Sequence, residues 1–308
     1  MLGRAVARRL SGVWSDDVLE TCSACDAMVV NLECCISDRG EPTGLIRDKP
    51  FFFRSPPTGV EALRAIGTTV AGMANNHALD YGPEALVDTV GRLREAGIVP
   101  VGAGLSVDEA RPGRVGQVGE TTVGVLAVSD HPSEFAAGGE SPGIAYADLR
   151  RGMPDWVLDE LESLRARADL VLVFPHWGPN MTVRPERRQR HHAAELIESG
   201  ADAVAGHSAH VFHGIEFVDG RPVLYDLGDA LDDYAVDPEL RNDLGILALW
   251  RPGGEPPIEL VGLALDFCHT RLASGAEADW IAGRLTRACE EFGTAVRRTD
   301  EARFAIDA

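Results

Sequence analysis

The stretch that most constrains the fold of this chain runs from residue 169 to residue 229. It contains two short apolar runs, Leu170–Phe174 and Ala201–Ala205, which are typical of buried strands. Between them lies Pro185–Ser199, whose apolar residues recur at helical spacing. This order of strand, helix and strand predicts a parallel sheet, so we expect an α/β fold for the chain.

Histidines follow both of these predicted strands at their carboxyl ends. His176 follows the first strand, and His207 and His210 follow the second. In open α/β sheets, ligands bind in the crevice beyond the carboxyl ends of the strands. Because imidazole is the commonest protein ligand for transition metals, three histidines at neighbouring strand ends favour a shared metal site. The alternative is that one histidine caps a turn and the other two lie on the surface.

Polar side chains also follow two earlier predicted strands. Glu33 comes directly after the apolar run Ala27–Leu32, where a carboxylate is either a cap for the next turn or a ligand in the crevice. Asn76 and His77 follow the strand predicted at Thr69–Met73. The amide oxygen of Asn76 is a suitable ligand for a hard or borderline metal.

Asp80 lies three positions after His77, and a carboxylate at this spacing can hold the imidazole in one tautomer. Asx-turn chemistry would explain asparagines in such a segment as well. It does not explain the pairing of His77 with Asp80, so we expect both residues in the site.

Two further residues are candidates for contact with an anionic substrate. Arg54 belongs to Lys49–Pro57, an aromatic and proline-marked segment that we interpret as an edge strand leading into a loop. Its guanidinium either clamps an anion or forms an exposed ion pair. His131 lies in Ser129–Gly143, a Gly-, Pro- and Ser-rich stretch whose length is typical of functional or mobile loops. We expect this loop to cover the site.

Charge and composition exclude some classes of function. The net charge of −19 argues against nucleic acid as a partner, because phosphate binding requires a basic face. Composition is that of a globular protein, and we expect a single domain over residues 1–308, with 276–308 as a C-terminal helix and tail. No run reaches the roughly 18 apolar residues of a membrane span, and the first residues lack the apolar core of a signal peptide. These features predict a cytoplasmic protein without a transmembrane segment.

The six cysteines are expected to be reduced, because a chain of 308 residues does not depend on disulfides for its core. A weaker alternative is a structural zinc site formed by Cys22, Cys25, Cys34 and Cys35.

Several spaced motifs in a fixed order resemble those of a known family. The chain resembles the CapA-type capsule and poly-γ-glutamate synthesis proteins, which belong to the calcineurin-like metallophosphoesterase superfamily. The resemblance covers nearly the whole chain, and the motifs that carry it are Asn31-Leu32-Glu33, Asn76-His77, His176-Trp177-Gly178, Gly206-His207 and His210-Val211.

The resemblance implies a four-layer α/β/β/α sandwich with two divalent metal ions in its crevice. Glu33 would bridge the two ions, and His210 would belong to one of the two sites. The other site would be completed by Asn76, His176 and His207. Manganese, iron and zinc all accept such a ligand set.

The resemblance also implies roles in catalysis. His77 would protonate the leaving group and Asp80 would support it. Arg54, His131 and Asp229 are the candidates for substrate contact. Asp229 stands where the family usually has asparagine.

One departure from the family lies at the start of the sequence. In the family a strand ending in Gly-Asp comes immediately before the segment that is here Met1-Leu2-Gly3-Arg4, and its aspartate is a metal ligand. The first strand of the sandwich and this carboxylate are missing from the sequence. Our hypothesis is that the start codon lies upstream. Without that aspartate, one metal site keeps only Glu33 and His210.

The sequence therefore predicts a metal-dependent hydrolase or acyl-transfer enzyme. The resemblance implies a γ-glutamyl amide polymer or peptide as its substrate, or alternatively a phosphoester, and a capsule synthase as its partner. The rival prediction is a non-catalytic subunit with a degenerate metallophosphatase fold, which binds a synthase or a glutamyl polymer.

Overall fold

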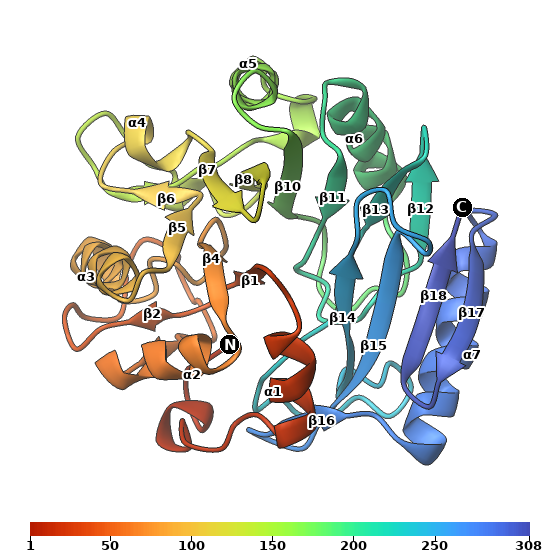
Figure 1. Ribbon diagram of the computed structural model, residues 1–308. Helices are drawn as coiled ribbons and strands as arrows, with labels where there is room; N and C mark the ends of the chain where they lie inside the picture. The colour runs from red at the N-terminus through yellow and green to blue at the C-terminus, as the bar shows by residue number, and fades with distance from the viewer.

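The computed structural model describes residues 1–308 and has a mixed α/β fold (Figure 1). Three parallel strands form one sheet in the order β1-β4-β5: β1 Met28–Asn31, β4 Thr68–Gly72 and β5 Val99–Val101. A second sheet has the order β12-β13-β11-β10-β8-β7: β7 Arg114–Val118, β8 Thr121–Ser129, β10 Leu170–His176, β11 Ala203–Ala205, β12 Ile215–Val218 and β13 Arg221–Leu224. The predicted α/β class is confirmed.

A third sheet contains the late strands in the order β14-β15-β18-β17, with β16 paired to β15: β14 Leu244–Trp250, β15 Ile258–Leu265, β16 Thr270–Leu272, β17 Ala295–Asp300 and β18 Arg303–Asp307. Two short two-stranded pairs complete the strands: β2 Cys35–Ile36 with β3 Arg54–Ser55, and β6 Ala103–Gly104 with β9 Gly143–Ile144. The helices are α1 Asp16–Ser23, α2 Val60–Ala65, α3 Gly82–Glu95, α4 Val107–Ala110, α5 Asp155–Arg165, α6 Arg187–Glu198 and α7 Gly275–Glu290.

The first two sheets face each other and are covered by helices on their outer sides. Helices α2 and α3 pack Leu63 and Leu86 into the core below the three-stranded sheet. Val101 and Phe174 belong to the apolar cluster between the two sheets. Helices α5 and α6 pack on the far side of the six-stranded sheet, where Leu196 is buried. The layers are therefore α/β/β/α, and the predicted four-layer arrangement is confirmed.

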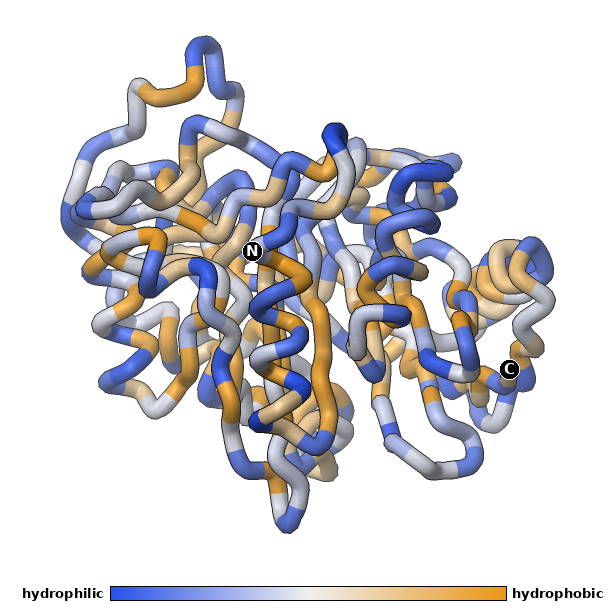
Figure 2. The backbone as a smooth tube through the Cα atoms, turned by 90° about the horizontal axis from the view of Figure 1, so that it is seen from above, coloured by the Kyte–Doolittle hydropathy of each residue, from blue (hydrophilic) through white to orange (hydrophobic).

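Strand β10 lies inside the second sheet. This position explains why the run Leu170–Phe174 is apolar throughout. It pairs in parallel with β8 on one side and with β11 on the other, so that Leu172 is opposite both Val125 and Ala203. Strands of a parallel sheet are covered on both faces and therefore consist of continuous apolar runs. Figure 2 shows the hydrophobic segments gathered in the interior, with hydrophilic loops outside.

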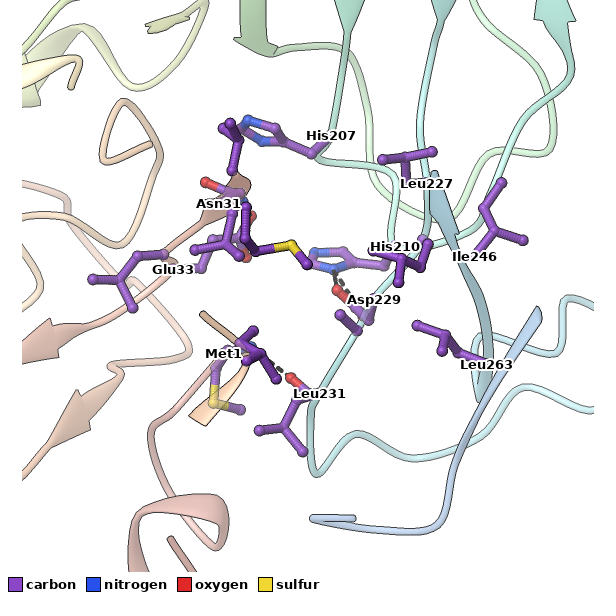
Figure 3. A pocket seen from close by; sticks show the side chains of 18 of the residues that line it. Met1, Asn31, Glu33, His207, His210, Leu227, Asp229, Leu231, Ile246 and Leu263 are labelled. Carbon is purple, nitrogen blue, oxygen red and sulfur yellow. Dashed lines mark hydrogen bonds and ion pairs between the residues drawn. The ribbon is translucent and has the colours of Figure 1, made fainter. Parts of the chain in front are cut away.

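Strand β1 has a hydrogen-bonded neighbour on one side only, namely β4. A cavity of about 170 Å³ lies between β1 and the strands β14 and β15. Its wall is mostly apolar and includes Val30, Ile246 and Leu263, while Glu33 and His207 line its polar end (Figure 3).

The segment 276–308 differs from the expected helix and tail. Helix α7 is present and begins with a capping box between Ser274 and Glu277. The residues after it form the hairpin β17–β18, and β18 pairs with β15 and buries Phe304 and Ile306. The expectation of a tail was wrong because the buried part of this hairpin is only the short run Phe304–Ile306 of β18, while β17 is exposed and its sequence is mostly polar. None of the helices combines the length and the apolar composition that a bilayer crossing requires.

Candidate metal centre

Three side chains from different sheets converge at the carboxyl ends of the strands. Glu33 follows β1, His176 is the last residue of β10, and His207 follows β11. Their ligand atoms lie within 4.8 Å of one another, and all three residues are buried. The Nδ1 atoms of His176 and His207 are 2.8 Å apart, and His176 Nδ1 is 3.3 Å from Glu33 Oε1. Because the carboxyl ends of the strands meet at one edge, Glu33 and His207 lie together although they are 174 positions apart in the sequence.

These distances fit a shared cation. Ligand atoms bound to one metal at about 2.0–2.2 Å are separated from each other by roughly 3–3.5 Å. The second ring nitrogen of each histidine, Nε2, is also buried and has no hydrogen-bond partner, which is rare for a buried polar atom. Asn31 Nδ2 donates a hydrogen bond of 2.8 Å to Glu33 Oε1 and so fixes the carboxylate. Glu33, His176 and His207 therefore suit a divalent metal.

The protonation of the histidines also suits a metal. Burial lowers the pKa of His207 to about 3. Burial, followed by the neighbouring His207, lowers the pKa of His176 well below its ordinary value. Both rings are therefore neutral near pH 7, and a neutral imidazole has the lone pair that a metal requires.

Asn76, His77 and Asp80 lie together after β4, as the sequence predicts. His77 Nδ1 is 2.7 Å from Asp80 Oδ2, and the His77 ring stacks on Phe53 at a centroid distance of 4.0 Å. Asp80 is fully buried and also accepts a 2.6 Å hydrogen bond from the backbone N–H of Phe53. The Asn76 Oδ1 atom is buried and has no hydrogen-bond partner. This amide oxygen is therefore available to a ligand.

Lys49 is a member of this group that the sequence reasoning missed. Its ammonium donates a 2.8 Å hydrogen bond to the carbonyl oxygen of Asn76 and lies 3.2 Å from Asp80 Oδ1. The sequence does hold a signal for it, since Lys49 is the only lysine in the chain.

His210 lies beside the triad but is engaged by a carboxylate. Its Nδ1 atom is 3.0 Å from Asp229 Oδ1 and 3.1 Å from Asp229 Oδ2, as the dashed line in Figure 3 marks. Burial alone would lower the pKa of His210, but Asp229 raises it to about 10. His210 is therefore an imidazolium paired with Asp229, and it has a left-handed backbone with φ of 60°. The structure places it at the same cavity as Glu33.

Buried carboxyl groups next to this pair also escaped the sequence reasoning. Burial raises the pKa of Asp226 to about 7, and burial together with Asp229 raises the pKa of Asp232 to about 8. Asp226 accepts hydrogen bonds from the backbone N–H groups of Ala209 and Gly228 and so fixes the segment that holds His210. No spacing in the sequence signals this role.

The two candidates for anion contact have different surroundings. His131 is half-buried, is hydrogen-bonded to Asp130 and has its ring 4.9 Å from the ring of His176, so the loop 129–143 does reach the site. Arg54 instead stacks on the Tyr81 ring at 3.6 Å and donates to the carbonyl oxygens of residues 39 and 40. The contacts of Arg54 are thus with the loop and with Tyr81, and with none of the proposed ligands.

The alternative of a zinc site made of cysteines is wrong. The triad of Glu33, His176 and His207 is the only group of three His, Cys, Asp or Glu side chains that converges closely enough to hold a metal. All six cysteines are free thiols, as expected. Burial raises the pKa of Cys22 to about 11 and that of Cys34 and Cys35 to about 12.

Comparison with known proteins gives relatives along most of the chain. The family model described as "Bacterial capsule synthesis protein PGA_cap" matches residues 1–234. A probable polyglutamine synthesis accessory protein of Mycobacterium tuberculosis strain H37Rv is 34% identical over 293 residues, covering 91% of this chain and 76% of that protein. The PGA biosynthesis protein CapA of Bacillus subtilis is 33% identical over 188 residues, covering 60% of this chain and 48% of that protein.

Proposed function

Because the chain belongs to the bacterial capsule synthesis protein PGA_cap family, we propose that it is a metal-dependent hydrolase or acyl-transfer enzyme that acts on a γ-glutamyl amide polymer or peptide. The single observation that carries this proposal is the convergence of Glu33, His176 and His207 beside the His77–Asp80 pair. A set of neutral imidazoles and a carboxylate next to a buried His–Asp pair is an arrangement for hydrolysis. A phosphoester is the alternative substrate, since fold does not decide between the two.

The residues divide into ligands and proton-transfer groups. Glu33, His176 and His207 would hold one divalent ion together with the orphan Oδ1 of Asn76. His210 would hold a second ion with Glu33 only after it loses the proton that it shares with Asp229. When bound, such ions polarise the scissile group and lower the pKa of water toward neutrality. Manganese, iron and zinc remain the candidates.

His77 would act as the general acid. Asp80 engages its Nδ1 atom, so it is the doubly protonated ring that would donate its Nε2 proton to the leaving group. Burial lowers the pKa of His77, and the hydrogen bond to Asp80 partly restores it. His131 and Asp229 line the approach to the triad, whereas we assign Arg54 only an indirect role through the loop that it supports.

A polyanionic substrate places a requirement on the charge of the site. A polyanion is repelled by a protein with a net charge of −19, so it requires local positive charge at the site. The bound cations would supply that charge. The cytoplasmic location and the capsule synthase partner stay predictions from the sequence.

The experiment that tests this function has two parts. Metal content per chain would be measured on the purified protein and on His176→Gln and His207→Gln, which we expect to lose bound metal. Hydrolysis of a γ-glutamyl anilide and of a chromogenic phosphodiester would then be measured with the wild type and with His77→Ala. We expect turnover to fall by a factor of about 10²–10⁴ in His77→Ala, with metal retained.

A non-catalytic binding subunit is the second candidate, and the name of the Mycobacterium relative, a probable accessory protein, favours it. Binding of poly-γ-glutamate without turnover, unchanged in His77→Ala, would establish this candidate in place of the enzyme.

A further inference from the structure

Of the 29 lysine and arginine residues, 28 are arginines, and the single lysine is Lys49. It is also the cation that lies against the His77–Asp80 pair. Its side chain is 7% exposed, whereas those of its neighbours Arg47 and Asp48 are 96% and 92% exposed. An exposed loop thus directs one buried amine into the site.

The backbone conformation at Asp48 turns Lys49 toward the site. Asp48 has a φ of 56°, in the left-handed region that is unfavourable for residues other than glycine and is best tolerated by Asp and Asn. The chain turns inward at Asp48, places Lys49 beside Asp80, and a few residues later donates the N–H of Phe53 to the same carboxylate. Strained backbone that persists next to a site is commonly tied to the function of that site.

The ammonium group joins two residues with different roles. One contact is the 2.8 Å hydrogen bond to the carbonyl oxygen of Asn76, whose side-chain Oδ1 atom is the orphan oxygen of the site. The other is the 3.2 Å contact with Asp80, which engages His77. The Phe135 ring lies 5.8 Å from the ammonium and connects it to the loop 129–143.

We propose that Lys49 is a positioning residue: its ammonium holds the segment 76–80 in the geometry that presents the Asn76 amide oxygen to the metal and His77 to the substrate. The proposal rests on the proposed function for the role of His77. It also predicts that loss of Lys49 weakens metal affinity, which can be measured whether or not the protein turns over a substrate.

The chemistry of the two cationic side chains explains why arginine does not replace this lysine. A lysine ammonium is a compact charge with three donors, and it can serve a carbonyl and a carboxylate from one nitrogen atom. A guanidinium is planar and needs two nitrogen atoms side by side for two acceptors. Asp80 is fully buried and offers no room for that plane without displacement of the segment.

The test compares Lys49→Met and Lys49→Arg with Arg47→Met, which removes a positive charge from an exposed position of the same loop. Zinc and manganese affinities would be measured by calorimetry. Removal of a group that orients a metal ligand weakens affinity by about 10- to 100-fold, and we expect this loss in Lys49→Met and a smaller one in Lys49→Arg. We expect Arg47→Met to bind metal like the wild type.

A second readout needs neither metal nor turnover. Nuclear magnetic resonance of isotope-labelled histidine, assigned with His77→Gln, reports the tautomer of His77. We expect one tautomer, protonated at Nδ1 toward Asp80, in the wild type and in Arg47→Met, and a mixture in the Lys49 variants. Where the wild type hydrolyses either substrate, Lys49→Met should lower kcat and leave KM within about twofold.

The outcomes separate the two proposals. Metal binding that depends on Lys49, in a wild type that hydrolyses nothing, would sink the enzyme proposal and support the positioning role. If the wild type binds no metal, the tautomer of His77 decides. Wild-type affinity and a wild-type His77 signal in both Lys49 variants would overturn the positioning role, and if Lys49→Met does not fold, Lys49→Arg decides alone.

Discussion

His213 shows how a single buried residue makes stability depend on pH. It is 1% exposed, and its Nε2 atom donates a 3.0 Å hydrogen bond to the carbonyl oxygen of Thr182, while Nδ1 has no partner. Burial lowers the pKa of this histidine from 6.5 to about 4, although the Thr182 carbonyl acts in the opposite direction. The folded protein therefore keeps His213 neutral where the unfolded chain would protonate it.

We predict the sign of this effect as follows. Below pH 6.5 His213 binds a proton in the unfolded chain but not in the folded protein. The free energy of unfolding therefore falls as the pH is lowered to about 4. The full loss is about 3 kcal/mol. Urea unfolding of the wild type and of His213→Gln between these two pH values would measure it.

The variant should show a flatter dependence on pH than the wild type over this range. The control is His191→Gln, because His191 lies on the exposed side of α6 and its side chain is 70% exposed. Equal slopes for the wild type and His213→Gln would contradict the prediction.

Elements differ in how well the sequence predicts them. The buried run Leu170–Phe174 was predicted because burial of both faces of a strand leaves a continuous apolar pattern. Hairpin β17–β18 was not predicted, because its outer strand β17 is exposed and contains few apolar residues. The hydrophobic pattern of a short buried strand such as β18 is hard to detect when the strand that precedes it is polar.

The site residues also differ in how well the sequence predicts them. Glu33, His77, His176 and His207 each follow an apolar strand, so topology alone predicts that they meet. Lys49 lies in a loop without periodicity, and its contact with Asp80 spans 31 positions of chain that only the tertiary fold closes. The pairing of His210 with Asp229 is likewise a tertiary contact.

Hairpin β17–β18 should contribute to the stability of the third sheet. Phe304 is fully buried in the cluster under α7, so we expect Phe304→Ala to lower the free energy of unfolding by about 3–5 kcal/mol. Val296→Ala, in the outer strand, should cost much less because Val296 is only half-buried. Chemical denaturation of both variants is the measurement, and a small cost for Phe304→Ala would mean that the hairpin is not stably docked.

For the molecule as a whole, the candidate centre joins the two facing sheets. Glu33 belongs to the sheet with β1, and His176 and His207 belong to the sheet with β10 and β11. A ligand that binds all three would therefore stabilise the contact between sheets on which the four-layer arrangement depends.

We predict that divalent metal raises the thermal midpoint of the protein. At a hundredfold excess over the dissociation constant the gain is about 2.7 kcal/mol. The midpoint would be recorded with chelator and with zinc or manganese, in the wild type and in the double variant His176→Gln and His207→Gln. The double variant should show no gain, and an equal gain in both proteins would place the metal elsewhere.

The scarcity of lysine has a consequence for regulation. All the basic side chains other than Lys49 and the histidines are guanidinium groups, which stay protonated at any physiological pH and are not substrates for lysine acetylation or ubiquitination. Enzymes that acylate lysine would find one target, and it is buried. Acylation of lysine therefore cannot change the charge of the surface that a partner meets.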